Sequence, residues 1–198
     1  DFIENFGFSD NDIEYLKTIG YKDDFLSYLK NLKFTGNIRS MQEGELCFGN
    51  EPLIRVEAPL IQAQLIETIL LNIINFHTLI ATKASRIRQI ALNDTLMEFG
   101  TRRGQEIDAA VWGARAAFIG GFDSTSNVRA GKLFDIPVSG THAHALVQTY
   151  GDEYTAFKKY AERHKNCVFL VDTFHTLKSG VPTAIKVAKE LGDTINFI

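Results

Sequence analysis

The sequence predicts an α/β fold built on parallel strands and preceded by a small α+β region. After Asn93, short apolar segments alternate with stretches of helical periodicity, which is the βα repeat that builds a parallel sheet. Before Asn93, two short helical segments and a stretch of alternating polar and apolar residues precede one long helical segment. We therefore expect two parts: an α+β region with a long buried helix over residues 1–92, and a βα repeat over residues 93–198.

The first region opens with two short helices over residues 9–32. Ser9 and Asp12 have the spacing of a capping box, in which the two side chains satisfy each other's backbone N–H groups. Between residues 37 and 58, apolar and polar residues alternate and glycines punctuate the pattern, which is typical of a small antiparallel sheet. We expect its strands at residues 44–48 and 53–57.

Residues 60–92 are predicted to form a single long helix, with Pro59 at its first position. Apolar residues recur at helical spacing and cover nearly the whole circumference around residues 69–74, which predicts that the helix is buried. Its titratable and basic residues are interpreted as packing or solvated positions rather than as a ligand site: His77, Lys83, Arg86 and Arg88.

The second region contains five candidate strands. They are expected at residues 95–99, 120–122, 136–138, 167–171 and 195–198. The helices between and after them are expected near residues 106–118, 128–134, 145–163 and 182–191. Five parallel strands fit either an open sheet or most of a closed barrel, and in both architectures ligands gather at the carboxyl ends of the strands.

Composition restricts the class of protein. The chain has 198 residues, of which 45% are hydrophobic and 23% charged, the balance of a globular protein with a real core. A net charge of -3 gives no electrostatic footprint for nucleic acid or a membrane surface. Cys47 and Cys167 lie too far apart in sequence to suggest zinc or a disulfide framework, so we expect a reduced, cytoplasmic protein.

No uninterrupted apolar run approaches the roughly 20 residues that span a bilayer, so no membrane segment is expected. The chain begins at Asp1 without an initiator Met and stops on the apolar segment 195–198, so we expect that both ends are cut.

Two strand ends carry groups suited to anions. Residues 98–103 place the Phe99 ring beside the guanidinium of Arg102, which can bind a carboxylate or phosphate while the ring stacks on a ligand. A core Phe beside a surface Arg is the equally weighted alternative. Residues 123–127 set five polar side chains ahead of a helix, where they can cap it or form an anion site with its N–H groups. The surplus of hydroxyls, including Ser126, favours a ligand.

Two further strand ends carry histidines and a carboxylate. Thr141, His142 and His144 follow the third of these strands. The two imidazoles suit either a metal ion or a histidine that acts as acid, base or nucleophile. Asp172 ends the next strand and can bind ribose hydroxyls, hold Mg²⁺ through water, orient His144, or simply cap a turn.

These segments together resemble the nicotinate phosphoribosyltransferase family, type II phosphoribosyltransferases that work at the mouth of an incomplete α/β barrel. Five stretches carry the resemblance in the family's order: residues 98–103, 120–128, 130–134, 136–144 and 170–173. A weaker likeness extends to residues 81–86. The resemblance implies transfer of phosphoribose from 5-phosphoribosyl-1-pyrophosphate to nicotinate, giving nicotinate mononucleotide and pyrophosphate in NAD biosynthesis.

The resemblance also implies roles for particular residues. ATP hydrolysis would be coupled to the transfer through a phosphohistidine at His144. Phe99 and Arg102 would contact the pyridine ring and its carboxylate region or nearby phosphates. Ser126 and Thr141 would line the pocket.

By the same matching, Asp172 would serve the ribose or the pyrophosphate, with Mg²⁺ held by the substrate's pyrophosphate rather than by the protein directly. A homodimer with shared active sites is also implied. Three positions depart from the family pattern, which usually has Ser at Ala145 and Tyr-Asp at residues 174–175. The alternatives are a nicotinamide-specific enzyme, a metal-dependent barrel hydrolase using His142 and His144, and an inactive structural fragment.

Overall fold

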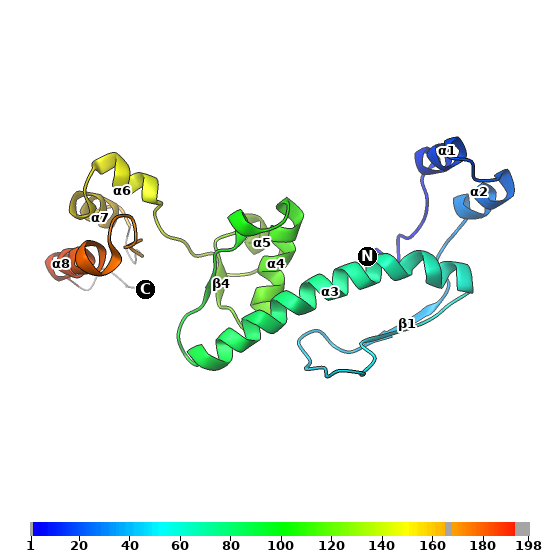
Figure 1. The fold of residues 1–198 in the computed structure, drawn as a ribbon, viewed down its shortest axis with the longest axis horizontal. Coiled ribbons are helices and arrows are strands. Elements are labelled where there is room, and N and C mark those ends of the chain that lie inside the picture. The colour runs from blue at the N-terminus through cyan, green and yellow to red at the C-terminus, as the bar shows by residue number, and fades with distance from the viewer. Residues whose placement is uncertain (1, 165–167, 193–198) are drawn as a thin grey trace.

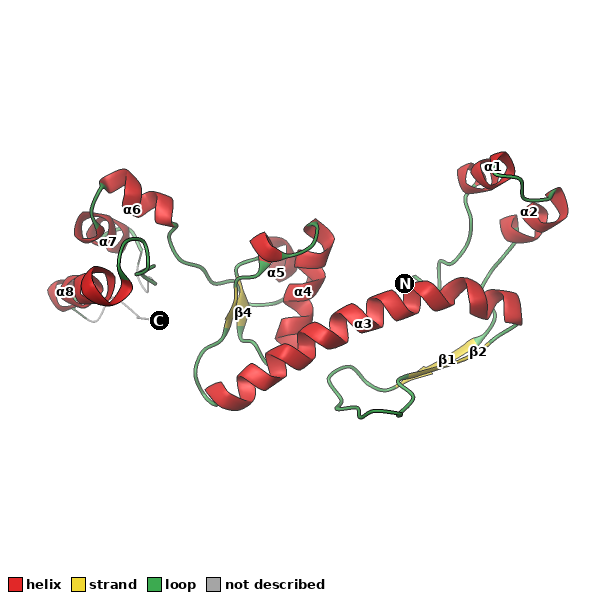
Figure 2. Cartoon of the chain, in the orientation of Figure 1, coloured by secondary structure: helices red, strands yellow, loops and turns green. Residues whose placement is uncertain are grey.

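The computed structural model describes residues 2–164 and 168–192. Its elements lie in three groups along an elongated molecule, at residues 10–57, 97–134 and 144–191 (Figure 1). The long helix α3 (Leu60–Ala91) links the first group to the second. Helices dominate, and the few strands are short (Figure 2). The carboxy-terminal strand expected at residues 195–198, and Cys167 at the start of another, lie outside the described residues.

The two amino-terminal helices are confirmed as α1 (Asp10–Thr18) and α2 (Asp23–Lys30). The capping box is present: the Asp12 N–H donates to Ser9 Oγ at 3.2 Å, and the Ser9 N–H donates to the Asp12 carboxylate at 2.8 Å. Within these two helices, the buried side chains are Leu26 and Leu29 of α2.

An antiparallel hairpin follows, formed by β1 (Asn37–Ser40) and β2 (Ile54–Glu57), with Asn37 opposite Glu57. The second expected strand is confirmed, but residues 44–48 form no strand. That segment lies in the loop between the strands, where Gly44 has a φ of +88° and Asn50 a φ of +70°. Positive φ angles turn the chain and do not continue an extended strand.

Helix α3 begins at Leu60 and runs for 32 residues, but the expectation that it is buried is wrong for the described chain. Only Gln62, Ile66 and Ala84 are buried, and Ile90 is 86% exposed. By length and mean hydropathy alone the helix could cross a bilayer. No single apolar run in the helix is long, because polar residues such as Glu67, Asn72 and Asn75 interrupt it, but the many Ile and Leu residues between them keep the mean hydropathy high. Core helices of soluble proteins can have the same length and mean hydropathy, so these two properties do not by themselves place α3 in a membrane.

The middle group contains the parallel strands β3 (Met97–Glu98) and β4 (Ser124–Thr125), paired Met97 with Ser124 and Glu98 with Thr125. A parallel bridge from Thr125 to Val138 adds a third extended segment. Parallel pairing is thus confirmed, but the described residues form only this small sheet and the hairpin, not a barrel. Residues 168–171 stay outside the sheet, and the Leu170 N–H donates instead to the His142 ring.

The helices of the repeat are α4 (Ile107–Ile119), α5 (Val128–Phe134), α6 (His144–Tyr150), α7 (Glu153–Ala161) and α8 (Val181–Leu191). The single helix expected over residues 145–163 is therefore divided into α6 and α7. Gly151 ends α6 with a φ of +81°, and the Asp152 carboxylate caps α7 by accepting the Thr155 N–H at 2.8 Å. A left-handed glycine followed by an Asp cap is a strong local stop and start signal.

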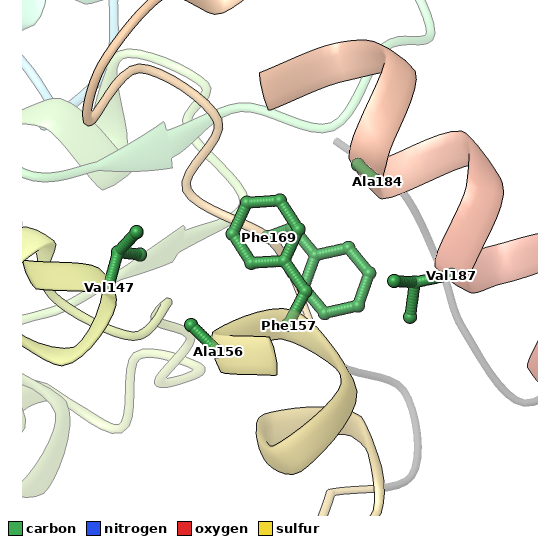
Figure 3. Packing of buried hydrophobic residues seen from close by; sticks show 6 residues of the cluster. All are labelled: Val147, Ala156, Phe157, Phe169, Ala184 and Val187. Atoms are coloured by element: carbon green, nitrogen blue, oxygen red, sulfur yellow. The ribbon is translucent and has the colours of Figure 1, made fainter. Parts of the chain in front are cut away.

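The third group has its own hydrophobic core (Figure 3). The rings of Phe157 and Phe169 stack with centroids 4.7 Å apart, and Phe157 is fully buried. The other members are Val147, Ala156, Ala184 and Val187. This core packs α6, α7 and α8 together and fixes the segment around Phe169, which leads directly to Asp172.

Candidate functional site

The end of β3 presents two of the expected site residues to solvent. Phe99 is 37% exposed and directly follows the strand. Arg102 is exposed in the short 3-10 helix η1 (Thr101–Arg103). The neighbouring Arg103 turns back, and its Nη1 donates to the Phe99 carbonyl at 3.5 Å. The exposed ring and the Arg102 guanidinium are therefore available to a ligand, and the core-Phe alternative is wrong.

At the end of β4, one polar residue caps the following helix and Ser126 does not take part in the cap. Asn127 caps α5, since its Oδ1 accepts the Ala130 N–H at 3.0 Å. Ser126 is exposed, while its N–H donates to the Glu98 carbonyl at 3.0 Å. Because Asn127 alone meets the needs of the helix, the Ser126 hydroxyl is left for another partner.

Asp123, the first residue of this polar run, has a structural role. Its carboxylate accepts the Leu96 N–H at 2.7 Å and pairs with Arg88 of α3 at 2.5 Å. The hydrogen bond from the Leu96 N–H is the largest cause that holds the pKa of Asp123 below its usual value, and the interaction with Arg88 adds to it. Arg88 thus anchors the end of α3 to the sheet, in agreement with its interpretation as a packing residue.

A pocket of about 370 Å³ opens beside these two strand ends. It lies between η1 and the beginnings of α4 and α5, and its lining is mixed: Thr101, Gly104, Glu106, Ile107, Ala110, Val111, Asn127 and Arg129. Two polar residues of the strand ends, Thr101 and Asn127, contribute to its wall.

His144 is the first residue of α6, and both of its ring nitrogens face polar groups from the fourth strand end. Its Nδ1 lies 3.1 Å from the Thr173 hydroxyl, and its Nε2 lies 3.8 Å from an Asp172 carboxylate oxygen. The ring and the carboxylate are partly exposed, with side chains 37% and 57% accessible. The expectation that Asp172 can orient His144 therefore agrees with this geometry. Thr173 was missed as a site residue, although its position directly after Asp172 was a usable signal.

His142 has a different environment from His144. It is only 6% exposed, and its ring packs against those of Phe157, Tyr160 and Phe169. Its Nε2 accepts the Leu170 N–H at 3.1 Å, which places the ring proton on Nδ1, facing the Ala143 carbonyl. Burial is the largest cause that lowers the pKa of His142, so the ring is held in its neutral form.

This geometry argues against a metal site at the His142 and His144 pair, because the Nε2 lone pair of His142 is already used. Among residues 2–164 and 168–192, no group of three or more His, Cys, Asp or Glu side chains could hold a metal ion. Thr141 is half-buried, and its hydroxyl donates to the His142 carbonyl at 2.8 Å.

The structure brings the four segments predicted as strand ends together in two pairs, although residues 168–171 form no strand. The first two ends share the Glu98 and Ser126 contacts, and the last two meet at His144. Figure 1 shows these pairs in separate groups, joined by the segment that runs from β4 and α5 to α6. A single ligand-binding edge was expected because all the strands were assigned to one sheet. The described residues 168–171 do not join that sheet.

Comparison with known proteins identifies the family. A model of the nicotinate phosphoribosyltransferase (NAPRTase) N-terminal domain matches residues 1–75. A nicotinate phosphoribosyltransferase of Bacillus subtilis is 67% identical over 100% of this chain and 41% of its own length. One from Mycobacterium tuberculosis is 39% identical over 98% of this chain and 42% of its own length. The chain thus spans less than half the length of these relatives.

Two crystal structures share the fold. Human nicotinic acid phosphoribosyltransferase has a TM-score of 0.77 and 28% identity, covering 99% of this chain and 50% of that one. Nicotinate-nucleotide pyrophosphorylase from Pyrococcus furiosus has a TM-score of 0.73 and 32% identity, covering 82% of this chain and 41% of that one. From its identity to the bacterial relatives over nearly all its residues, we conclude that the chain belongs to the nicotinate phosphoribosyltransferase family.

Proposed function

We propose that this chain supplies part of the active site of a nicotinate phosphoribosyltransferase. The complete protein would transfer phosphoribose from 5-phosphoribosyl-1-pyrophosphate to nicotinate, in NAD biosynthesis. The names of its relatives support this activity. The observation that carries the proposal is the placement of His144 between Thr173 and Asp172 at the start of α6.

In the proposed ATP-coupled step, an imidazole nitrogen of His144 attacks the γ-phosphorus of ATP. A nitrogen–phosphorus bond forms, the bond to the β-phosphate oxygen breaks, and ADP leaves. Water later attacks the phosphorus, the nitrogen–phosphorus bond breaks, inorganic phosphate leaves, and the neutral ring is restored. Attack develops positive charge on the ring, and the Asp172 carboxylate 3.8 Å from Nε2 would stabilise that charge, while Thr173 holds the ring in place.

The ribosyl transfer itself would use the first two strand ends. Phe99 would stack on the pyridine ring, and the Arg102 guanidinium would bind the carboxylate of nicotinate. Ser126 and Thr141 would line the nicotinate-binding site of the complete protein, and neither belongs to the lining of the pocket of about 370 Å³ beside η1. The Arg102 assignment separates nicotinate from nicotinamide, which lacks a carboxylate for Arg102 to bind.

Mg²⁺ would be bound by pyrophosphate oxygens of the substrate, with the exposed Asp172 carboxylate able to accept hydrogen bonds from its water ligands. Bound there, the ion would neutralise charge on the leaving pyrophosphate. The protein residues would orient the ribose and exclude competing water. A cytoplasmic homodimer with shared active sites belongs to the same proposal, and light scattering on the full-length parent should give a dimer mass. A monomer that is active would refute that part.

The phosphohistidine assignment is tested with the full-length parent protein and labelled ATP. The wild type should acquire acid-labile phosphate, and His144→Ala should acquire none. His164→Ala is the matched control, because His164 is an exposed histidine in the same group of helices and should label normally. Equal labelling of the wild type and His144→Ala would refute the assignment.

The nicotinate assignment is tested by Arg102→Gln, with Arg103→Gln as the control. Arg102→Gln should raise the KM for nicotinate roughly tenfold or more, because it removes a charge-assisted hydrogen bond to the substrate. Arg103 turns toward the backbone, so its variant should have a nearly normal KM. Equal effects of the two substitutions would overturn the role of Arg102.

A further inference from the structure

The carboxylate of Glu98 is engaged on both of its oxygens at the end of β3. Oε1 accepts the N–H of Gly100, and Oε2 accepts the hydroxyl of Thr125 at 2.7 Å. Thr125 belongs to the neighbouring strand and is fully buried. Glu98 therefore ties the turn after its own strand to the strand beside it.

The contacts continue until they close a ring. The Thr125 oxygen accepts the N–H of Asn127 at 3.0 Å, and the Asn127 side-chain amide donates to the hydroxyl of Thr101 at 3.2 Å. Thr101 adjoins Gly100, where the ring began. Asn127 is 8% exposed, so much of this network is shielded from water. A satisfied polar network in such a place holds one geometry, because any alternative arrangement leaves buried groups unpaired.

The two side chains proposed to recognise nicotinate are attached to this ring. Phe99 lies between Glu98 and Gly100, both of which are ring members. Arg102 directly follows Thr101 in η1. The Ser126 N–H donates to the backbone carbonyl of Glu98 at 3.0 Å, so the third proposed ligand-binding residue is tied to the same point.

We propose that Glu98 is a positioning residue that sets the spacing of Phe99, Arg102 and Ser126 for the pyridine carboxylate. It acts through the ring formed with Gly100, Thr125, Asn127 and Thr101 and does not touch the substrate. This inference rests on the proposed function, since the ligand groups are those assigned to nicotinate there. Within this positioning unit Thr125 is fully buried and Glu98 is half-buried, and Arg102 is the exposed group that would contact the ligand.

The test compares Glu98→Ala, Glu98→Gln and Thr125→Val in the full-length parent protein. Glu98→Ala removes both acceptors and should raise the KM for nicotinate by roughly tenfold to a hundredfold, because misplacing a binding group weakens its contact with the ligand. Preference for nicotinate over nicotinamide should fall with it. Glu98→Gln keeps the shape and one acceptor oxygen, so it should restore most of the wild-type KM.

Thr125→Val should reproduce part of the Glu98→Ala effect, and the double variant should lose less than the product of the two single effects, because both break the same ring. Glu162→Ala is the control, since it removes an exposed carboxylate paired only locally with Lys159, and should leave the KM unchanged. If Glu98→Ala fails to fold, as judged by circular dichroism, Thr125→Val and Glu98→Gln decide the matter.

Two readouts separate this inference from the proposed function. The KM for 5-phosphoribosyl-1-pyrophosphate and the labelling of His144 should be unchanged in Glu98→Ala, because His144 and the adjacent Asp172 lie with α6, which belongs to another group of helices (Figure 1). An active wild type with an unchanged nicotinate KM in Glu98→Ala and Thr125→Val would overturn the positioning role alone. A wild type that uses no nicotinate would overturn the proposed function instead.

Discussion

Replacing His142 with Phe should destabilise the third group of helices while keeping its aromatic packing. The Phe ring can occupy the space between Phe157, Tyr160 and Phe169, but it cannot accept the Leu170 N–H that lies 3.1 Å from Nε2. Leaving a largely buried donor unpaired costs about 1–3 kcal/mol. Leu170 is only half-buried, so we expect a loss of about 1–2 kcal/mol in the free energy of unfolding at pH 8.

The effect should depend on pH with a definite sign. Burial lowers the pKa of His142 from its usual 6.5, so the unfolded chain binds a proton more readily than the folded one. The wild type therefore has its full stability above pH 6.5 and loses this contribution as the pH falls toward the folded-state pKa. His142→Phe has no such proton, so its stability deficit should shrink on acidification.

Urea denaturation followed by circular dichroism at pH 8 and at pH 5.5 measures both effects. Hydrogen exchange at the Leu170 amide reports the local contact directly. His142→Gln keeps an acceptor and should retain more protection at that amide than His142→Phe. A Phe variant with wild-type stability at pH 8 and a protected Leu170 amide would refute the structural role of His142.

Three further stability predictions follow from packing and are measured by urea denaturation. Gly180→Ala should cost at least about 2 kcal/mol, because its Cβ would lie 1.8 Å from the Val171 carbonyl oxygen, whereas Gly49→Ala meets nothing within 4 Å and should stay within about 0.5 kcal/mol of wild type. Phe157→Ala should cost about 3–5 kcal/mol, since the ring is fully buried, and a smaller loss would mean that the core collapses around the gap. Arg88→Met should cost about 1.5–3 kcal/mol, because the guanidinium bonds three backbone carbonyls and one carboxylate, and unchanged stability would show that water replaces these bonds.

Local signals in the sequence were sufficient where a feature depends on neighbouring residues. The capping box of Ser9 and Asp12 and the extent of α5 were predicted as they occur. The exposed Phe99 and Arg102 were placed at the end of a strand, where they are found. Gly151 and Asp152, which divide α6 from α7, are local signals of the same kind, although a single helix was predicted across them.

Features that depend on contacts between residues distant in the sequence could not be predicted from it. The hydrogen-bonded ring around Glu98 joins segments that lie 26 or 27 residues apart in sequence, and no spacing rule indicates that Thr125 and Asn127 close it. The burial of α3 was inferred from apolar residues that cover nearly its whole circumference, but that pattern does not say which other elements cover the helix, and the described chain leaves most of it exposed.

The sequence by itself determined the family and the order of the strand-end motifs, and the resemblance to that family pointed to His144 as the histidine of interest. It did so because these depend on residue types at fixed spacing along the chain. Only the tertiary structure decided that His142 is a buried, neutral packing residue and that His144 faces Asp172 and Thr173. The reason is physical: two imidazoles separated by a single residue are chemically identical until folding buries one against aromatic rings and leaves the other beside a carboxylate.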